Sequence, residues 1–197
     1  MVDPLRLIIG ISGASGVVYG IRLLEILRAT AVETHLIMSK AAEMTISYET
    51  HKQPAEIKKS ADVWYPVADI GAPISSGSYR TEGMIIAPCS VRTMAEIASG
   101  VTSSLLTRSA DVVLKERRRL VLLVRETPLH AGHLQAMLRV TEMGAIVMPP
   151  VPAFYTRPRN LDDVVNQTLG RALDLFGIDV GLTRRWGEDF GPGQENS

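Results

Sequence analysis

The sequence predicts a three-layer α/β fold, Rossmann-like or flavodoxin-like, in which a parallel sheet carries helices on both faces. Several short, near-continuous apolar runs are typical of strands buried on both sides. Amphipathic stretches of helical length alternate with these runs, and glycine-rich or proline-rich turns separate them. The 197 residues are enough for one core, so we expect a single domain over 1–197. We expect the tail after about residue 186 to be mobile or to contact another subunit.

The first half of the chain alternates strands and helices from its start. The run LRLIIGI, from Leu5 to Ile11, ends at a glycine-rich turn and predicts the first buried strand. Pro54, Pro66 and the stretch Ser75-Ser76-Gly77-Ser78 predict irregular structure between 52 and 80. In chain order we expect a strand over 5–11, a helix over 17–29, a strand over 32–38, a helix over 41–51 and a short strand over 62–67.

The second half continues the alternation. The apolar run GMIIA predicts a strand that Pro88 ends, and Pro149 and Pro150 interrupt a later one. We expect Arg117, Arg118 and Arg119 to form a solvated helix end. The expected elements are a strand over 83–87, helices over 91–99 and 105–118, a strand over 119–125, a helix over 131–143, a strand over 145–148 and a helix over 161–176.

Composition excludes several classes of function. Lys and Arg number 21, as do Asp and Glu, so no overall charge favours nucleic acid or an anionic membrane, and any bound anion requires a local cluster of cations. Cys89 is the only cysteine, which excludes an internal disulfide and a cysteine-built metal site and fits a reducing compartment. An early acid and a short apolar run argue against a signal peptide or membrane span. We therefore expect a cytoplasmic protein.

Two motifs follow predicted strands, where ligands of parallel sheets bind. Gly10-Ile-Ser-Gly-Ala-Ser-Gly16 lacks the dinucleotide spacing Gly-x-Gly-x-x-Gly, yet its small residues allow close approach and the following helix offers N–H groups to an anion. A tight turn without ligand is the alternative. In Pro88-Cys-Ser-Val-Arg-Thr93, Ser90 is a natural N-cap, and Ser90, Arg92 and Thr93 are suited to a phosphate or a flavin edge. Cys89 is better explained as a small buried residue than as a nucleophile.

Charged residues near the predicted ligand edge are further candidates. Arg108 and Lys115 are two helical turns apart, about 10 Å along the axis. Arg125 ends a strand, and Arg171 borders the apolar stripe of the last helix. Taken singly, each of these cations is better explained as a solvated surface group. Glu49 and Glu126 lie near element ends and could move a proton, although a surface acid is the simpler interpretation of Glu49. We interpret His130 and His133 as structural.

Taken together, these motifs resemble those of the UbiX-type flavin prenyltransferases, phenylacrylic acid decarboxylase-like proteins of the flavin-containing cysteine decarboxylase superfamily. The resemblance extends from Leu5 to about Trp186. It is carried by the glycine motif, Ser39, the Pro88–Thr93 motif, the stretch DVVLKERR from Asp111 to Arg118, Arg125-Glu-Thr-Pro-Leu and Pro149-Pro-x-Pro-x-Phe-Tyr.

The resemblance implies that the protein transfers a dimethylallyl group from dimethylallyl phosphate to N5 and C6 of reduced flavin mononucleotide (FMN), without metal. The product, prenylated FMN, would pass to a UbiD-type decarboxylase. Family members are homododecamers with active sites where subunits meet. The implied FMN-binding residues are Gly13, Ala14, Ser15, Ser39, Ser90, Val91, Arg92, Thr93 and Arg125. The implied residues for dimethylallyl phosphate, the monophosphate being favoured, are Arg108, Lys115, Tyr155 and Arg171.

The catalytic roles follow from the same resemblance. Glu126 is the candidate for the proton at N5, while Ser15 and Glu49 are candidates for a relay that serves ring closure. Lys115, with Arg108 and Arg171, would stabilise the departing phosphate. Tyr155 or Trp186 would cover the allyl group, although simple packing explains Trp186 equally well.

Three other functions compete with prenyl transfer. A flavin-binding carrier or accessory subunit of a decarboxylase would not need the second cation set. A flavin-dependent cysteine decarboxylase would need a cysteine on a mobile clamp and a base histidine, for which Cys89 and His51 are poor candidates. A nicotinamide oxidoreductase is disfavoured by the glycine spacing.

Overall fold

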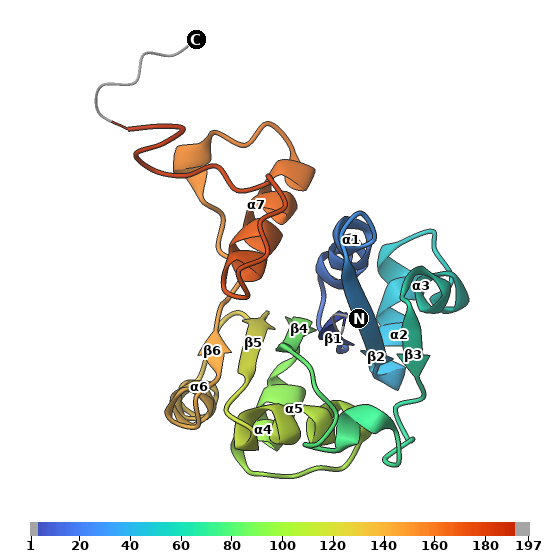
Figure 1. Ribbon diagram of the computed structural model, residues 1–197. Helices are drawn as coiled ribbons and strands as arrows, with labels where there is room; N and C mark the ends of the chain where they lie inside the picture. The colour runs from blue at the N-terminus through green and yellow to red at the C-terminus, as the bar shows by residue number, and fades with distance from the viewer. Residues whose placement is uncertain (1–3, 192–197) are drawn as a thin grey trace. The chain divides into compact units, whose positions relative to one another are not determined.

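The computed structural model describes residues 4–191, which form parts of two compact units divided after Pro149 (Figure 1). The first unit holds the sheet and six of the helices, and the second holds the last helix and the segment that follows it. That both belong to one domain over 1–197 stays a prediction. Of the predicted tail, Trp186 and Phe190 pair in an isolated bridge. Residues 192–197 lie outside the described part of the chain.

The first unit contains a parallel sheet that, within the described residues, has six strands in the order β3-β2-β1-β4-β5-β6. This order is the Rossmann order, and it confirms the predicted three-layer α/β fold. The chain runs outward from β1 in one direction and from its neighbour β4 in the other, so the switch point lies between these two strands. The strands are β1 (Leu5–Ile11), β2 (Val32–Met38), β3 (Val63–Tyr65), β4 (Gly83–Cys89), β5 (Arg119–Val124) and β6 (Ile146–Val147).

Helices cover both faces of this sheet (Figure 1). Gly10 of β1 faces Leu106 of α5, whereas its neighbour Ile11 packs against Gly20 of α1, so α1 and α5 lie on opposite faces. Among the described residues of this unit, no helix combines the length and apolarity that crossing a bilayer requires. The helices are α1 (Val18–Leu27), α2 (Lys40–Glu49), α3 (Pro54–Ser60), α4 (Val91–Ala98), α5 (Leu105–Lys115) and α6 (Ala131–Glu142), with a 3₁₀ turn at Pro73–Ser75.

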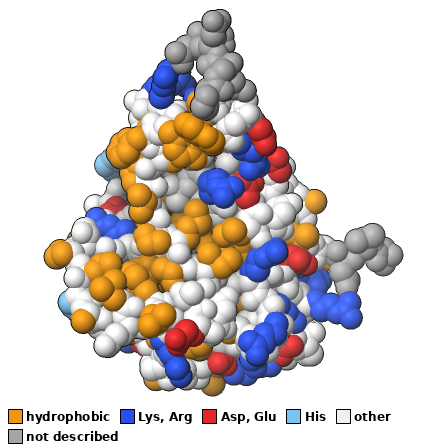
Figure 2. All heavy atoms as spheres, turned by 90° about the vertical axis from the view of Figure 1, so that its left-hand side faces the viewer, with side chains coloured by type: hydrophobic (Ala, Val, Ile, Leu, Met, Phe, Trp, Pro, Cys, Tyr) orange, Lys and Arg blue, Asp and Glu red, His pale blue; other side chains and the backbone are white. Residues whose placement is uncertain are grey.

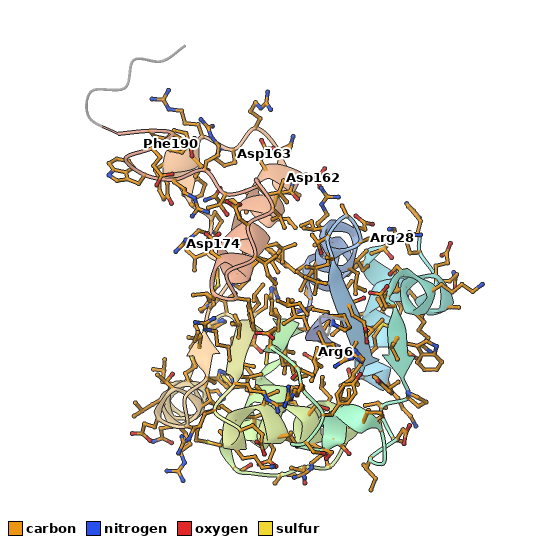
Figure 3. The ribbon with its side chains drawn as sticks, viewed as in Figure 1. Arg6, Arg28, Asp162, Asp163, Asp174 and Phe190 are labelled. Carbon is orange, nitrogen blue, oxygen red and sulfur yellow. The ribbon has the colours of Figure 1, made fainter. Side chains whose placement is uncertain are left out.

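The second unit is built around α7 (Leu161–Asp174), which follows the 3₁₀ turn Phe154–Thr156. Asn160 caps the helix, and Asp162 and Asp163 occupy its first turn, where negative charge suits the helix dipole (Figure 3). The segment after α7 returns along it, because the Gln167 side chain exchanges two hydrogen bonds with the backbone of Arg184, at 2.9 and 3.1 Å. This helix is also too short and polar to span a membrane.

The predicted strands and helices match the observed ones except at specific points. Sequence reasoning missed α3 because Pro54 was taken as a breaker. Instead, Pro54 starts the helix, where its missing N–H costs nothing, and Gln53 and Glu56 form a capping box in front of it. Strand β4 does not end before Pro88 but continues to Cys89.

We expected a solvated helix end at Arg117, Arg118 and Arg119; this was wrong for Arg118 and Arg119, whereas Arg117 is exposed just after α5. Helix α5 stops at Lys115, Arg117 adopts a left-handed conformation with φ of 57°, and Arg119 begins β5. The half-buried guanidinium of Arg118 donates to the carbonyls of Gly77 and Tyr79, at 2.7 and 2.8 Å. The basic run therefore joins a helix to a strand and secures a loop.

Gly20 allows α1 to lie close against the sheet, which leads to a stability prediction. A Cβ at this position would collide with the Ala87 carbonyl oxygen and lie 2.7 Å from the Ile11 side chain. We expect Gly20→Ala to lower the free energy of unfolding by about 1–3 kcal/mol, because overpacking outweighs the better helix propensity of alanine. Urea unfolding followed by circular dichroism measures the change.

Gly71→Ala is the matched control, since the nearest atom to a Cβ there, in the Asp69 side chain, is 3.6 Å away. Its effect should stay within about 0.5 kcal/mol. A Gly20→Ala protein as stable as this control would contradict the close packing of α1.

Candidate functional site

The loops after β1 and β4 are tied together at the switch point by one buried hydroxyl. Ser12 donates to the Pro88 carbonyl at 2.8 Å and accepts from the Ser90 N–H at 2.7 Å. The Ser12 side chain is fully buried, so both bonds form away from water. This geometry fixes where the next helix, α4, begins.

Three helices begin around one pocket of about 450 Å³ within the first unit. Ser39, Ser90 and Ser104 line it and are the N-caps of α2, α4 and α5. Each cap hydroxyl accepts a hydrogen bond from the third helical residue only, which leaves the N–H groups of the first two residues of α2 and α4 without intrahelical partners. Helix N-termini with such N–H groups attract anions. The pocket is therefore suited to a phosphate.

Five predicted flavin-binding residues line this pocket: Gly13, Ser39, Ser90, Arg92 and Thr93. The exposed Arg92 side chain pairs with Glu96 at 2.9 Å, so its guanidinium lies at the rim. Ser90 is the expected N-cap. Lys40, Ser104 and Thr107 also line the pocket and were missed. The spacing Ser104-x-x-Thr107, a capping box, is the signal that marks this helix start.

The remaining predicted flavin-binding residues do not line this pocket. Arg125 follows β5, and its N–H donates to the Cys89 carbonyl at 3.1 Å, beside the end of β4. Ala14 is nearly buried, Ser15 is exposed and Val91 is the first residue of α4. Their roles toward a flavin stay predictions.

Glu49 corrects one expectation about the glycine motif. Its carboxylate accepts hydrogen bonds from the N–H groups of Gly16 and Val17, at 2.8 and 3.1 Å. The N–H groups of Gly16 and Val17, just before α1, are therefore taken by a side-chain anion and are not free for a ligand. That the first N–H groups of α1 itself bind an anion stays a prediction. The same contact places Glu49 beside the residue that follows Ser15, its predicted relay partner.

Glu126 and His130 lie between β5 and α6, and His133 lies in the first turn of α6. The half-buried Glu126 carboxylate accepts from the Thr127 N–H at 3.0 Å. His130 is the N-cap of α6, accepting from the Gly132 N–H at 3.1 Å, and its ring stacks on His133 with centroids 3.6 Å apart. Among the described residues, no cluster of three or more His, Cys, Asp or Glu side chains could hold a metal.

The predicted substrate cations fall in both units, and each has an acidic partner nearby. Arg108 and Lys115 lie on α5, where Arg108 pairs with Asp111 at 2.7 Å and Lys115 pairs with Glu116. Arg171 lies on α7 and pairs with Asp174 at 2.8 Å. An incoming phosphate would have to compete with these carboxylates.

Asp174 and Tyr155 organise the second unit. Two hydrogen bonds from the Arg185 guanidinium, and secondarily the Arg171 bond, hold the pKa of Asp174 below its usual value. The ring of the half-exposed Tyr155 meets Trp186 and Phe190 edge-on, with centroids 5.7 and 6.1 Å away. Trp186 thus packs on Tyr155, the other residue predicted to cover the allyl group.

This combination of fold and pocket defines a class of protein. A Rossmann-ordered sheet with a phosphate-suited pocket at its switch point is typical of α/β proteins that bind nucleotides. The family model "Flavoprotein" matches residues 1–172. The flavin prenyltransferase UbiX of Escherichia coli K12 is 58% identical over 184 residues, covering 92% of this chain and 97% of the relative. The chain therefore belongs to the flavoprotein family and, within it, to the UbiX flavin prenyltransferases.

Other relatives and solved structures agree with this assignment. The mitochondrial flavin prenyltransferase PAD1 of Saccharomyces cerevisiae is 49% identical, covering 93% of this chain and 76% of the relative. AnUbiX (PadA1), solved in complex with FMN and dimethylallyl pyrophosphate, superposes with a TM-score of 0.92 at 50% identity, covering 94% of this chain and 98% of its own. A dodecameric FMN-dependent UbiX-like protein from E. coli O157:H7 gives a TM-score of 0.90 at 48% identity, covering 92% and 99%.

Cys89 supports a chemical prediction about the site. Its side chain is fully buried, as expected, and burial raises the pKa of its thiol to about 12. The reactive thiolate is therefore scarce at neutral pH. We expect a disulfide reagent such as Ellman's reagent to modify the native protein roughly a hundredfold more slowly than the urea-unfolded chain.

A Ser47→Cys variant provides the positive control, because Ser47 is exposed on α2. It should gain one rapidly reacting thiol in the native state. Rapid modification of Cys89 in the folded wild-type protein would contradict its burial.

Proposed function

We propose that this chain transfers a dimethylallyl group from dimethylallyl phosphate to N5 and C6 of reduced FMN, and that its product, prenylated FMN, passes to a UbiD-type decarboxylase in the cytoplasm. The observation that carries the proposal is the convergence of three helix N-termini on the switch-point pocket. That arrangement suits the phosphate of a mononucleotide. Membership of the flavin prenyltransferases supports the reaction.

The donors around the pocket fit FMN. The hydroxyls of Ser39, Ser90 and Thr93 and the first N–H groups of α2 and α4 are neutral donors that a phosphate can accept from. Lys40 supplies a positive charge in the same pocket. We propose that Gly13, Ala14, Ser15, Val91, Arg92 and Arg125 complete the FMN site.

The remaining site residues act on the reaction itself. Reduced flavin supplies the nucleophilic N5 and the ring carbon C6 that bond to the dimethylallyl group. Glu126 exchanges the proton at N5, and Ser15 with Glu49 relays the proton lost on ring closure. Glu49 is suited to a fixed orientation, since two backbone N–H groups hold its carboxylate.

The phosphate of dimethylallyl phosphate is proposed to bind to Arg108, Lys115, Tyr155 and Arg171. Guanidinium and ammonium groups stabilise the charge that develops on a departing phosphate, and the Tyr155 hydroxyl adds a hydrogen bond. AnUbiX was solved with dimethylallyl pyrophosphate, which is consistent with a prenyl phosphate as ligand. A mere flavin carrier would not need this second cation set.

We also propose that the protein assembles as a homododecamer, in which neighbouring subunits complete each active site. The relative from E. coli O157:H7 is dodecameric. Figure 2 shows hydrophobic side chains gathered on the side of the first unit that carries α6. Leu134 and Leu138 of that helix are 54% and 60% exposed. Apolar surface of this kind commonly marks an interface between subunits.

The reaction can be tested by anaerobic incubation with chemically reduced FMN and dimethylallyl phosphate, followed by mass spectrometry of the released flavin. We expect the flavin mass to increase by one dimethylallyl group, without added metal. Arg171→Ala should bind FMN normally but lower the rate of transfer by about a hundredfold or more, because it removes a charge that stabilises the leaving phosphate.

Arg28→Ala is the control, since Arg28 is an exposed cation at the end of α1 (Figure 3). It should react at the wild-type rate. Flavin that returns unmodified from the wild-type protein would overturn the prenyltransferase proposal and favour the carrier.

A further inference from the structure

The side chain of Lys115 lies where a side chain of residue 77 would otherwise be. A Cβ placed on Gly77 would come within 2.7 Å of the Lys115 ammonium and would collide with the Glu116 carboxylate. Gly77 is not among the residues with positive φ, so its backbone conformation does not itself demand glycine. A side chain at residue 77 would therefore have to displace Lys115 and Glu116.

The loop that carries Gly77 is held in place from the same helix end. Arg118 donates one hydrogen bond to the Gly77 carbonyl at 2.7 Å and another to the Tyr79 carbonyl at 2.8 Å. Within the loop, the Tyr79 N–H donates to the Ser76 carbonyl at 3.2 Å. Because these bonds anchor the loop, a side chain at residue 77 would displace Lys115 and Glu116 more readily than the backbone.

The position of Lys115 on its helix makes such a support necessary. Lys115 is the last residue of α5, about half exposed, and lysine has four freely rotating side-chain bonds. Its ion pair with Glu116 is solvent-exposed, and exposed pairs restrain a side chain only weakly. The surface at Gly77 adds a steric boundary on one side of the ammonium, and the Glu116 carboxylate adds an attraction on another.

We propose that the loop of residues 76–79, with Gly77 at its centre and Arg118 as its anchor, is the positioning element for Lys115. By fixing where the ammonium lies, it sets the affinity for the phosphate of the prenyl substrate. The proposal rests on the proposed function of Lys115 as a phosphate-binding residue. Gly77 and Arg118 are positioning residues and need not touch either substrate.

The first test compares Michaelis constants for the two substrates. In Gly77→Ala, the KM for dimethylallyl phosphate should rise about tenfold, the loss expected for one displaced charge-assisted hydrogen bond, while the KM for reduced FMN stays unchanged. Gly71→Ala is the matched control and should leave both constants unchanged, since a Cβ there has room. An unchanged KM for dimethylallyl phosphate in Gly77→Ala would overturn the proposal.

A double-mutant cycle separates positioning of Lys115 from general damage. Lys115→Ala alone should raise the KM for dimethylallyl phosphate, and adding Gly77→Ala should then change it less than about twofold, because its target is gone. Independent, multiplicative effects would contradict the proposal. If Lys115→Ala itself leaves this KM unchanged, the phosphate-binding role assigned to Lys115 fails first, which distinguishes the two failures.

Arg118→Gln keeps the test decisive if Gly77→Ala folds poorly. It removes the two hydrogen bonds to the loop without adding an atom at residue 77. Its KM for dimethylallyl phosphate should also rise, again only when Lys115 is present. If the KM for dimethylallyl phosphate in Arg118→Gln equals that of the wild-type protein, Arg118 does not position Lys115 through the loop.

Discussion

The hydroxyl of Ser12 is the interaction on which the site depends. It donates to the Pro88 carbonyl and accepts from the Ser90 N–H, and so joins the ends of β1 and β4. These neighbouring strands form the switch point of the parallel sheet. Because Ser90 then caps α4, the bridge determines where that helix N-terminus points. Without the hydroxyl, the Ser90 N–H would lose its partner, at a cost of about 1–3 kcal/mol. The Pro88 carbonyl would keep only the hydrogen bond from the Ser12 N–H, at 3.2 Å.

An anion site in this protein does not require a basic surface. The chain has equal numbers of acidic and basic residues, and Arg92, Arg108, Lys115 and Arg171 all pair with carboxylates. The pocket relies instead on the N-termini of α2, α4 and α5, whose N–H groups are fixed by the backbone. In the proposed reaction, the fixed N–H groups of the helix N-termini bind the phosphate of FMN. The flexible side chains of Arg108, Lys115 and Arg171 bind the phosphate of the prenyl substrate.

Local sequence predicted what depends on local physics. The buried strands β1 and β2 have the predicted bounds, because continuous apolar runs specify them, and Ser90 is the predicted cap. Contacts between distant segments were not predictable: Glu49 occupies the start of α1 from 32 or 33 residues away, and Arg118 anchors a loop some forty residues earlier, with separations of 39 and 41. In the sequence, Glu49 and Arg118 look like ordinary charged surface residues, and nothing in the neighbouring residues indicates their partners. Only the folded structure shows which backbone groups they bind.

The central claim is that the switch-point pocket binds the phosphate of a flavin mononucleotide. Isothermal titration calorimetry with FMN and with riboflavin, which lacks only the phosphate, tests it most directly. The account predicts that FMN binds about a hundredfold or more tightly than riboflavin, as two charge-assisted hydrogen bonds from helix N-termini would provide. Equal affinities for the two flavins would contradict it.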